Sequence, residues 1–341
     1  MSDLRTTPGF DEVWRPVGGR RVRPQAVLKP TNGDVRARLG RVVGRVPEVM
    51  VKVTGRTRGA GHLGAHLSYI TRNGELEAED REGMTILGRG EVAELAKDWE
   101  AMAELDRRRT ARTPTSLSVV LSMPASTDPT ALRDAARDFA QRTFGEAHDY
   151  VFVLHTDADH PHVHLTVRAL GDQGERLNPK KADLEAWRQA FAQALRDRGV
   201  EAEATPRRAR GVTRKAERTP VRKLRERLAA SGAGVPRVIA QAYREAAPAA
   251  LGRATEAPPW ETAIARRQAR IRALYLAQAR VLGSSPDPED RALARSVARF
   301  VTEMPPPDTQ RLMLARQLRE ARARLGEVEK GSGGRGKERG R

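Results

Sequence analysis

The chain has 341 residues, enough for one or two domains that each bury a core. It carries a formal charge of +18, with 62 basic against 44 acidic side chains, which favours a polyanionic partner such as nucleic acid. Cysteine is absent, which excludes disulfides and thiolate ligands and leaves histidines and carboxylates for any metal site. The sequence contains neither an apolar run of membrane-spanning length nor a signal-peptide core, so we expect a cytoplasmic protein with no membrane partner.

The positive charge is concentrated in the second part of the chain. Residues 201–341 hold 31 Lys and Arg against 16 Asp and Glu, a net charge of +15, whereas residues 1–200 hold 31 against 28, a net charge of +3. We therefore expect the front of the chain to carry chemistry and the back to supply affinity for phosphates.

Residues 1–45 show no sustained apolar period and are predicted to form a basic, loosely ordered leader. Residues 46–210 alternate β-branched runs with amphipathic stretches, which predicts an α+β domain with a mainly antiparallel sheet. In chain order we expect a strand over 49–53 ended by a turn at Thr54-Gly55, helices over 61–73 and 91–102, a strand over 116–123, a helix from 129 through 140, a hairpin of strands over 150–154 and 163–167, and a helix over 183–198.

The remaining residues are rich in Arg and Ala and predict a basic, mainly helical region over 211–330 that binds DNA or a partner. The helical stretches are 221–230, 263–282 and 312–328. Residues 331–341, rich in Gly, are expected to form a disordered tail.

Histidines provide the first chemical signal, because all seven lie between His62 and His164. Side chains alternate across a strand, so His162 and His164 share one face, and His155 ends the preceding strand next to them. Three neutral imidazoles that converge in this way leave coordination positions open, which favours a metal centre over a solvated turn with incidental histidines. Asp157 or Asp159 would orient a ligand.

Tyr69 is the second candidate. Helical spacing places it on one stripe with His62 and His66, about 100° away from the apolar stripe that should face the core. Taken alone, this pattern favours ordinary packing at a helix margin over a nucleophile.

Further candidates are polar side chains suited to a sugar-phosphate chain. Ser118 and Ser122 alternate with apolar residues along one strand, although half-exposed serines are common there. The basic candidates for phosphate contacts, each of which is also compatible with a solvated surface, are Arg168, Arg176, Lys180, Lys181, Arg207, Arg208 and Arg210.

From about Val49 to Arg210 the sequence resembles the relaxases, the mobilisation nucleases of conjugative plasmids, in the branch that includes the T-DNA border endonuclease. The resemblance depends on blocks that occur in the same order: Val51-Lys-Val-Thr-Gly55 with Ala65-His-Leu-Ser-Tyr-Ile-Thr-Arg-Asn-Gly74, Leu121-Ser-Met-Pro124 with Thr127-Asp128-Pro129, Leu154-His-Thr-Asp-Ala-Asp-His-Pro-His-Val-His-Leu-Thr-Val167, and Arg176-Leu-Asn-Pro-Lys-Lys-Ala-Asp-Leu184.

The resemblance implies a five-stranded antiparallel sheet flanked by helices, as in HUH endonucleases. It assigns His162 and His164 as the paired metal ligands, His155 as the third ligand, Tyr69 as the nucleophile, and Ser122 as a DNA contact. It implies nicking and rejoining of single-stranded transfer-origin DNA through a 5′-phosphotyrosine and a free 3′-hydroxyl. The implied cofactor is a divalent cation, Mg²⁺, Mn²⁺ or Zn²⁺, and the implied partners include relaxosome accessory proteins and the type IV secretion coupling protein.

Several alternatives remain open on the sequence. His160, Asp157 and His66 are candidate bases for Tyr69. His66-Leu67-Ser68 and His164-Leu165-Thr166 also fit the paired motifs of a metal-independent two-histidine phosphoesterase. The basic C-terminal part equally fits a non-catalytic protein that binds a transfer origin.

Overall fold

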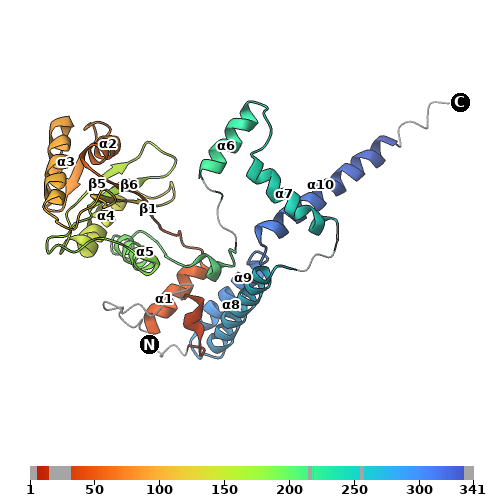
Figure 1. The fold of residues 1–341 in the computed structure, drawn as a ribbon. Helices are drawn as coiled ribbons and strands as arrows, with labels where there is room; N and C mark the ends of the chain where they lie inside the picture. Colours follow the sequence, from red (N-terminus) through yellow and green to blue (C-terminus); the bar gives the residue numbers. More distant parts are fainter. Residues whose placement is uncertain (1–5, 15–31, 214–216, 218, 254–256, 334–341) are drawn as a thin grey trace. The chain divides into compact units, whose positions relative to one another are not determined.

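The computed structural model describes residues 6–14, 32–213, 217, 219–253 and 257–333, which form two compact units (Figure 1). The described residues of the first unit are 32–205, and those of the second are 6–14 together with the described residues from Pro206 onward. The first unit ends at Thr205, and the sequence prediction ends its domain at residue 210.

The first unit is an α+β domain, as predicted, but its antiparallel sheet has six strands instead of five, in the order β1-β4-β6-β5-β2-β3. The additional strands escaped prediction because β2 has three residues and β3 two, too few to show a period. The elements are α1 (Asn32–Val43), β1 (Met50–Thr57), α2 (Ala60–Ile70), β2 (Ala78–Asp80), β3 (Thr85–Ile86), α3 (Gly88–Glu104), β4 (Ser116–Ser122), α4 (Pro129–Phe144), β5 (Tyr150–His155), β6 (His162–Arg168) and α5 (Lys181–Arg196).

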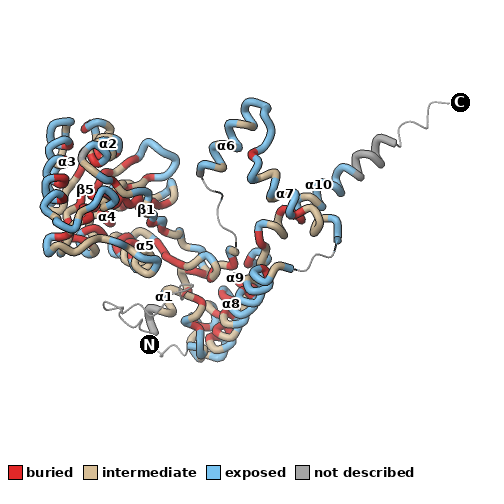
Figure 2. Tube along the Cα trace, in the orientation of Figure 1, coloured by how far each residue is buried: buried red, intermediate tan, exposed pale blue. Residues whose placement is uncertain are grey.

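Helices cover both faces of this sheet, as Figures 1 and 2 show. On one face α4 and α5 bury a large core that includes Phe139, Phe191 and Leu165. On the other face α2 and α3 bury a smaller core that includes Leu67, Trp99 and Val153. The smaller core leaves part of its face uncovered, since Met50 on the edge strand β1 is 46% exposed.

Strand β1 corrects one predicted boundary. We expected a turn at Thr54-Gly55, but the strand continues to Thr57. Its register with β4 shifts between Val53 and Gly55, so the turn-like residues form a β-bulge within the ladder.

The leader contains two helical segments within the part that the structure describes. Helix α1 belongs to the first unit and is held there by Glu203, whose buried carboxylate lies 2.8 Å from Arg41 Nε and 3.4 Å from Arg38 Nε. The 3₁₀ helix η1 (Phe10–Val13) belongs to the second unit. The rest of the expected loose leader, residues 1–5 and 15–31, lies outside the described residues.

The second unit is helical, in agreement with the predicted C-terminal region. Phe10 of η1 packs edge-on against Tyr275, with ring centroids 5.7 Å apart. Among the described residues, no helix has both the length and the apolarity needed to cross a membrane. Helix α10 includes residues 331–333 of the expected tail, and residues 334–341 lie outside the description. The elements are η2 (Arg207–Arg210), α6 (Thr219–Ala230), α7 (Arg237–Ala250), α8 (Pro259–Gly283), α9 (Pro288–Glu303) and α10 (Gln310–Gly333).

Candidate metal centre and nucleophile

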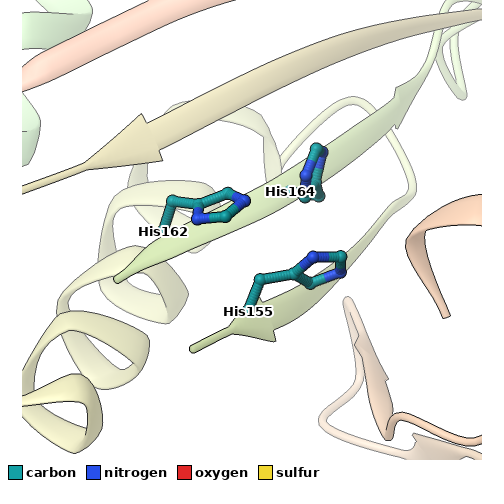
Figure 3. Close-up of side chains that lie close together, drawn as sticks. All are labelled: His155, His162 and His164. Carbon is teal, nitrogen blue, oxygen red and sulfur yellow. The ribbon is translucent and has the colours of Figure 1, made fainter. Parts of the chain in front are cut away.

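Three histidines converge at one end of the β5–β6 hairpin (Figure 3). His155 and His162 are directly opposite each other in the antiparallel register, and His164 follows on the same face of β6. The ring centroids of His155 lie 5.2 Å from His162 and 4.6 Å from His164, and those of His162 and His164 lie 5.1 Å apart. One nitrogen from each ring lies within 4.8 Å of the other two. The hairpin therefore brings the three predicted ligands together.

Hydrogen bonds fix how two of these rings present their nitrogens. His155 Nε2 donates to the carbonyl of Ile70 at 2.6 Å, and His162 Nδ1 donates to the carbonyl of His160 at 3.1 Å. Each bond leaves the other ring nitrogen with its lone pair, as in metal sites where a second hydrogen bond sets the tautomer. The lone pair on His155 Nδ1 also faces Arg72 Nη2 at 3.5 Å. Nitrogens that share an ion at about 2.1 Å lie at most about 4.2 Å apart, so a slight closure of the rings fits this donor set to a divalent cation.

The electrostatic surroundings favour the neutral form of two of the three rings. Burial, followed by the neighbouring His155 and His162, lowers the pKa of His164 to about 3. Burial also lowers the pKa of His155. Neutral imidazole is the form that binds a metal, so protons do not compete for these two rings at neutral pH.

Tyr69 lies in the last turn of α2, beside the histidines. Its side chain is 59% exposed, and its ring meets that of His164 edge-on with centroids 6.1 Å apart. The helix ends directly after it, because Thr71 Oγ1 bonds back to the carbonyl of Leu67 at 2.8 Å and Gly74 N donates to the same Oγ1 at 3.1 Å. An exposed phenol thus borders a group of convergent nitrogens.

Arg72 also lies beside these residues, and the sequence interpretation missed it. Its guanidinium lies 5.5 Å from the ring centroid of Tyr69, 2.5 Å from Asp157 Oδ2 and 3.5 Å from His155 Nδ1. The residue has a φ of 52°, a left-handed conformation that is uncommon for a side chain of this size. A basic residue after a helix gives no sequence signal for such a conformation, although Arg72 lies in the same Tyr-Ile-Thr-Arg block as Tyr69.

The candidate bases occupy different environments. Asp157 is paired with Arg72, whose hydrogen bond lowers the pKa of that carboxyl. His160 and Asp159 are exposed in the turn between β5 and β6. His66 Nε2 lies 2.9 Å from both Ser118 Oγ and Thr166 Oγ1.

The two strand serines lie on the histidine face of the sheet. Ser122 is directly opposite His162, is 7% exposed and donates to the carbonyl of Pro161 at 3.3 Å. Ser118 lies four residues earlier on the same face, under α2.

Within the first unit, the predicted basic DNA contacts are not gathered at this site. Arg168 is a correction: it is 4% exposed and bonded to Asp149 and Asp172, so its guanidinium cannot reach a phosphate. Arg176 is paired with Asp106. Lys180 and Lys181 are exposed at the start of α5, which packs on the other face of the sheet.

Known proteins share the region that forms this site. A family model described as the MobA/VirD2-like nuclease domain of relaxases matches residues 69–200. The T-DNA border endonucleases VirD2 of Rhizobium radiobacter and Agrobacterium fabrum are 27% and 26% identical over 187 and 188 residues, which is 48% and 49% of this chain. The chain covers only 43% and 41% of the length of these two relatives.

Solved structures give a distant likeness. A MobM relaxase domain bound to a 26-nucleotide oriT DNA is 14% identical, covers 50% of this chain and 96% of its own, and has a TM-score of 0.36. A structure from work on vancomycin resistance transfer in Staphylococcus aureus is 13% identical, covers 47% and 98%, and has a TM-score of 0.33. By its family model and its relatives, the stretch from Tyr69 to Val200 is a relaxase nuclease domain of the MobA/VirD2-like branch.

Proposed function

We propose that this protein is a metal-dependent endonuclease that nicks and rejoins one DNA strand at a plasmid transfer origin, with Tyr69 as nucleophile. The observation that supports the proposal most directly is the placement of an exposed tyrosine ring 6.1 Å from one of three convergent histidines. Two elements distant in sequence, α2 and the β5–β6 hairpin, bring these groups together.

The divalent cation, Mg²⁺, Mn²⁺ or Zn²⁺, would be held by His155, His162 and His164 and would offset the charge on the non-bridging oxygens of the scissile phosphate. The phenolic oxygen of Tyr69 forms a bond to phosphorus, and the bond to the 3′ oxygen breaks. The products are a 5′-phosphotyrosine and a 3′-hydroxyl that has gained a proton. Since the ester conserves the bond, the 3′-hydroxyl of a strand end can reverse the reaction.

The phenol must lose its proton to a base as it attacks. His66 is engaged by two hydroxyls and Asp157 by Arg72, so we propose the exposed His160 as the base. Arg72 lies between Tyr69 and Asp157, where its charge favours an anionic phosphate and a developing phenolate. Ser122, beside His162, is the proposed contact for the bound strand.

The relatives named as T-DNA border endonucleases and the MobM domain bound to oriT DNA support transfer-origin DNA as the partner. The net charge of +15 over residues 201–341 supports added affinity for its phosphates. A cytoplasmic location, relaxosome accessory proteins and a type IV coupling protein belong to the same proposal.

The decisive experiment is incubation of the full chain with labelled single-stranded DNA tiled across the transfer origin of the replicon that encodes it, with Mn²⁺ or Mg²⁺. Denaturing electrophoresis should reveal a protein-linked DNA fragment with wild type and none with Tyr69→Phe. Tyr243→Phe, which alters a tyrosine in the helical unit, is the matched control and should retain the adduct.

The same experiment judges the alternatives. Absence of an adduct with wild type would leave the non-catalytic origin-binding protein as the better account. Cleavage that persists after chelation would favour the two-histidine phosphoesterase, although His66 lies on a helix and does not mirror the strand-borne His164.

A further inference from the structure

His66 connects α2 to the sheet through two strands at once. Its Nε2 lies 2.9 Å from Ser118 Oγ on β4 and 2.9 Å from Thr166 Oγ1 on β6. Ser118 and Thr166 are directly opposite each other in the β4–β6 register, and their side chains are buried at 5% and 0% exposure. The ring is thus seated on a buried cross-strand pair of hydroxyls.

This contact is aligned with the contact between Tyr69 and His164. Tyr69 follows His66 by three residues, which places both on one side of α2 about 4.5 Å apart along the helix axis. His164 precedes Thr166 by two residues on the same face of β6, about 6.8 Å along the strand. His66 therefore lies over Thr166 and Tyr69 lies beside His164, with α2 running antiparallel to β6.

The remaining contacts of α2 do not by themselves fix its rotation. Leu63, Leu67 and Ile70 pack in the core shared with α3, and apolar contacts are not directional. Among the described residues, the hydrogen bond from His155 Nε2 to the carbonyl of Ile70 holds α2 near the histidines, on the β5 side of the helix. The bonds of His66 fix the β4–β6 side, so Tyr69 is held between two anchors.

We infer that His66 is a positioning residue for the proposed reaction: it clamps α2 onto the Ser118–Thr166 pair and thereby holds the Tyr69 hydroxyl within reach of a phosphate at the histidine centre. The inference rests on the proposed function and replaces the alternative in which His66 is the base. Its ring nitrogen Nε2 is already engaged by both hydroxyls.

The kinetic test compares His66→Leu, His66→Gln and His62→Leu in the adduct assay with full-length protein. His66→Leu should slow adduct formation by about 10- to 100-fold with little change in the DNA concentration for half-maximal rate, because the nucleophile is misplaced. His66→Gln keeps hydrogen-bonding atoms and should recover part of the rate. His62, exposed on the same helix, is the matched control and should leave the rate unchanged.

A pH profile separates positioning from base catalysis. If His66 were the base, the acid limb of the rate profile would vanish in His66→Leu. A positioning role lowers the rate at every pH and retains the limb. The double variant Thr166→Val/His66→Leu should slow adduct formation no more than His66→Leu alone, because both substitutions remove the same contact, between His66 and Thr166.

A spectroscopic measurement tests the inference without activity. The chain has four tyrosines, so 3-fluorotyrosine labelling gives four ¹⁹F signals, and Tyr69→Phe identifies the one from Tyr69. His66→Leu, or Thr166→Val if that variant does not fold, should shift or broaden this signal, while His62→Leu should not. An unchanged Tyr69 signal overturns the inference. Failure of wild type to form an adduct refutes the proposed function alone, because the ¹⁹F result is independent of it.

Discussion

His164 differs from its partners because neighbours surround it on several sides. The rings of His155 and His162 lie within 5.1 Å of it, and the edge of Tyr69 lies beside it. A proton on His164 would be buried and would face further histidines and Arg72, which is why its pKa falls to about 3. Burial and the neighbouring histidines thus favour the neutral ring, which is the form that binds a cation, and make its protonation unfavourable.

The folded protein without metal should therefore lose stability in acid. The pKa of His164 is below the ordinary value of 6.5 in the folded state, so below pH 6.5 the unfolded chain binds a proton that the folded chain resists. The contribution is present above pH 6.5 and is lost as the pH falls towards about 3, by at most about 1.4 kcal/mol per pH unit. Urea unfolding in chelator between pH 7 and pH 4 should show a shallower decline for His164→Gln than for wild type. Equal slopes would contradict this account.

At the scale of elements, the turn after α2 sets the direction in which the site residues point. Arg72, Asn73 and Gly74 all have positive φ, at 52°, 59° and 84°. Three left-handed residues in succession reverse the chain beside Tyr69 and direct Arg72 back to Asp157. Gly74 permits the closest approach, since its carbonyl accepts from Gly88 N at 2.9 Å at the start of α3.

Gly74→Ala should destabilise the nuclease unit by about 2 kcal/mol or more. A Cβ at this position would lie 2.4 Å from the carbonyl carbon of Gly88, which is backbone and cannot rotate away. Urea unfolding followed by the fluorescence of the buried Trp99 on α3 measures the loss, in a background where the other three tryptophans are replaced by Phe. Gly90→Ala is the control, because a Cβ there has nothing within 4 Å and no positive φ. A Gly74→Ala protein as stable as Gly90→Ala would show that the turn relaxes freely.

Helices and strands with a clear hydrophobic periodicity could be predicted from the sequence. The convergence of the three histidines could be predicted in the same way. Strand alternation and a short turn were enough to place His155, His162 and His164 together. The strands β2 and β3 and the continuation of β1 past Gly55 depend on pairing with neighbours, which a local pattern does not encode. The burial of Arg168 and the approach of Arg72 to Asp157 likewise arise from tertiary contacts. The sequence alone does not distinguish a charged residue that forms an ion pair from one that is exposed to solvent.

At the scale of the whole molecule, the two ends of the described chain belong to one unit. Residues 6–14 cluster with the helices that follow Pro206, although the nuclease domain separates them in sequence. Thr7 N donates to Gln278 Oε1 at 2.8 Å, and Glu12 pairs with Arg270 at 2.7 Å, so polar contacts with α8 flank the buried Phe10. The N-terminal segment is thus part of a helical core and not an independent basic arm.

Phe10→Ala should destabilise the helical unit by about 3 kcal/mol, since Phe10 is 2% exposed and packs against Tyr275 and Trp14. The loss should be seen in a ¹⁹F signal from fluorotyrosine at Tyr275 during urea unfolding, whereas the Trp99 transition of the nuclease unit should not move. Leu276→Ala, a truncation of a 38% exposed side chain on the same helix, should cost far less. If Phe10→Ala instead shifted only the Trp99 transition, the N-terminal segment would belong to the nuclease unit.

The helical unit carries most of the chain's positive charge. Unfolding of this unit should therefore weaken DNA binding more at low salt than at high salt, while Tyr69 still forms an adduct with saturating DNA.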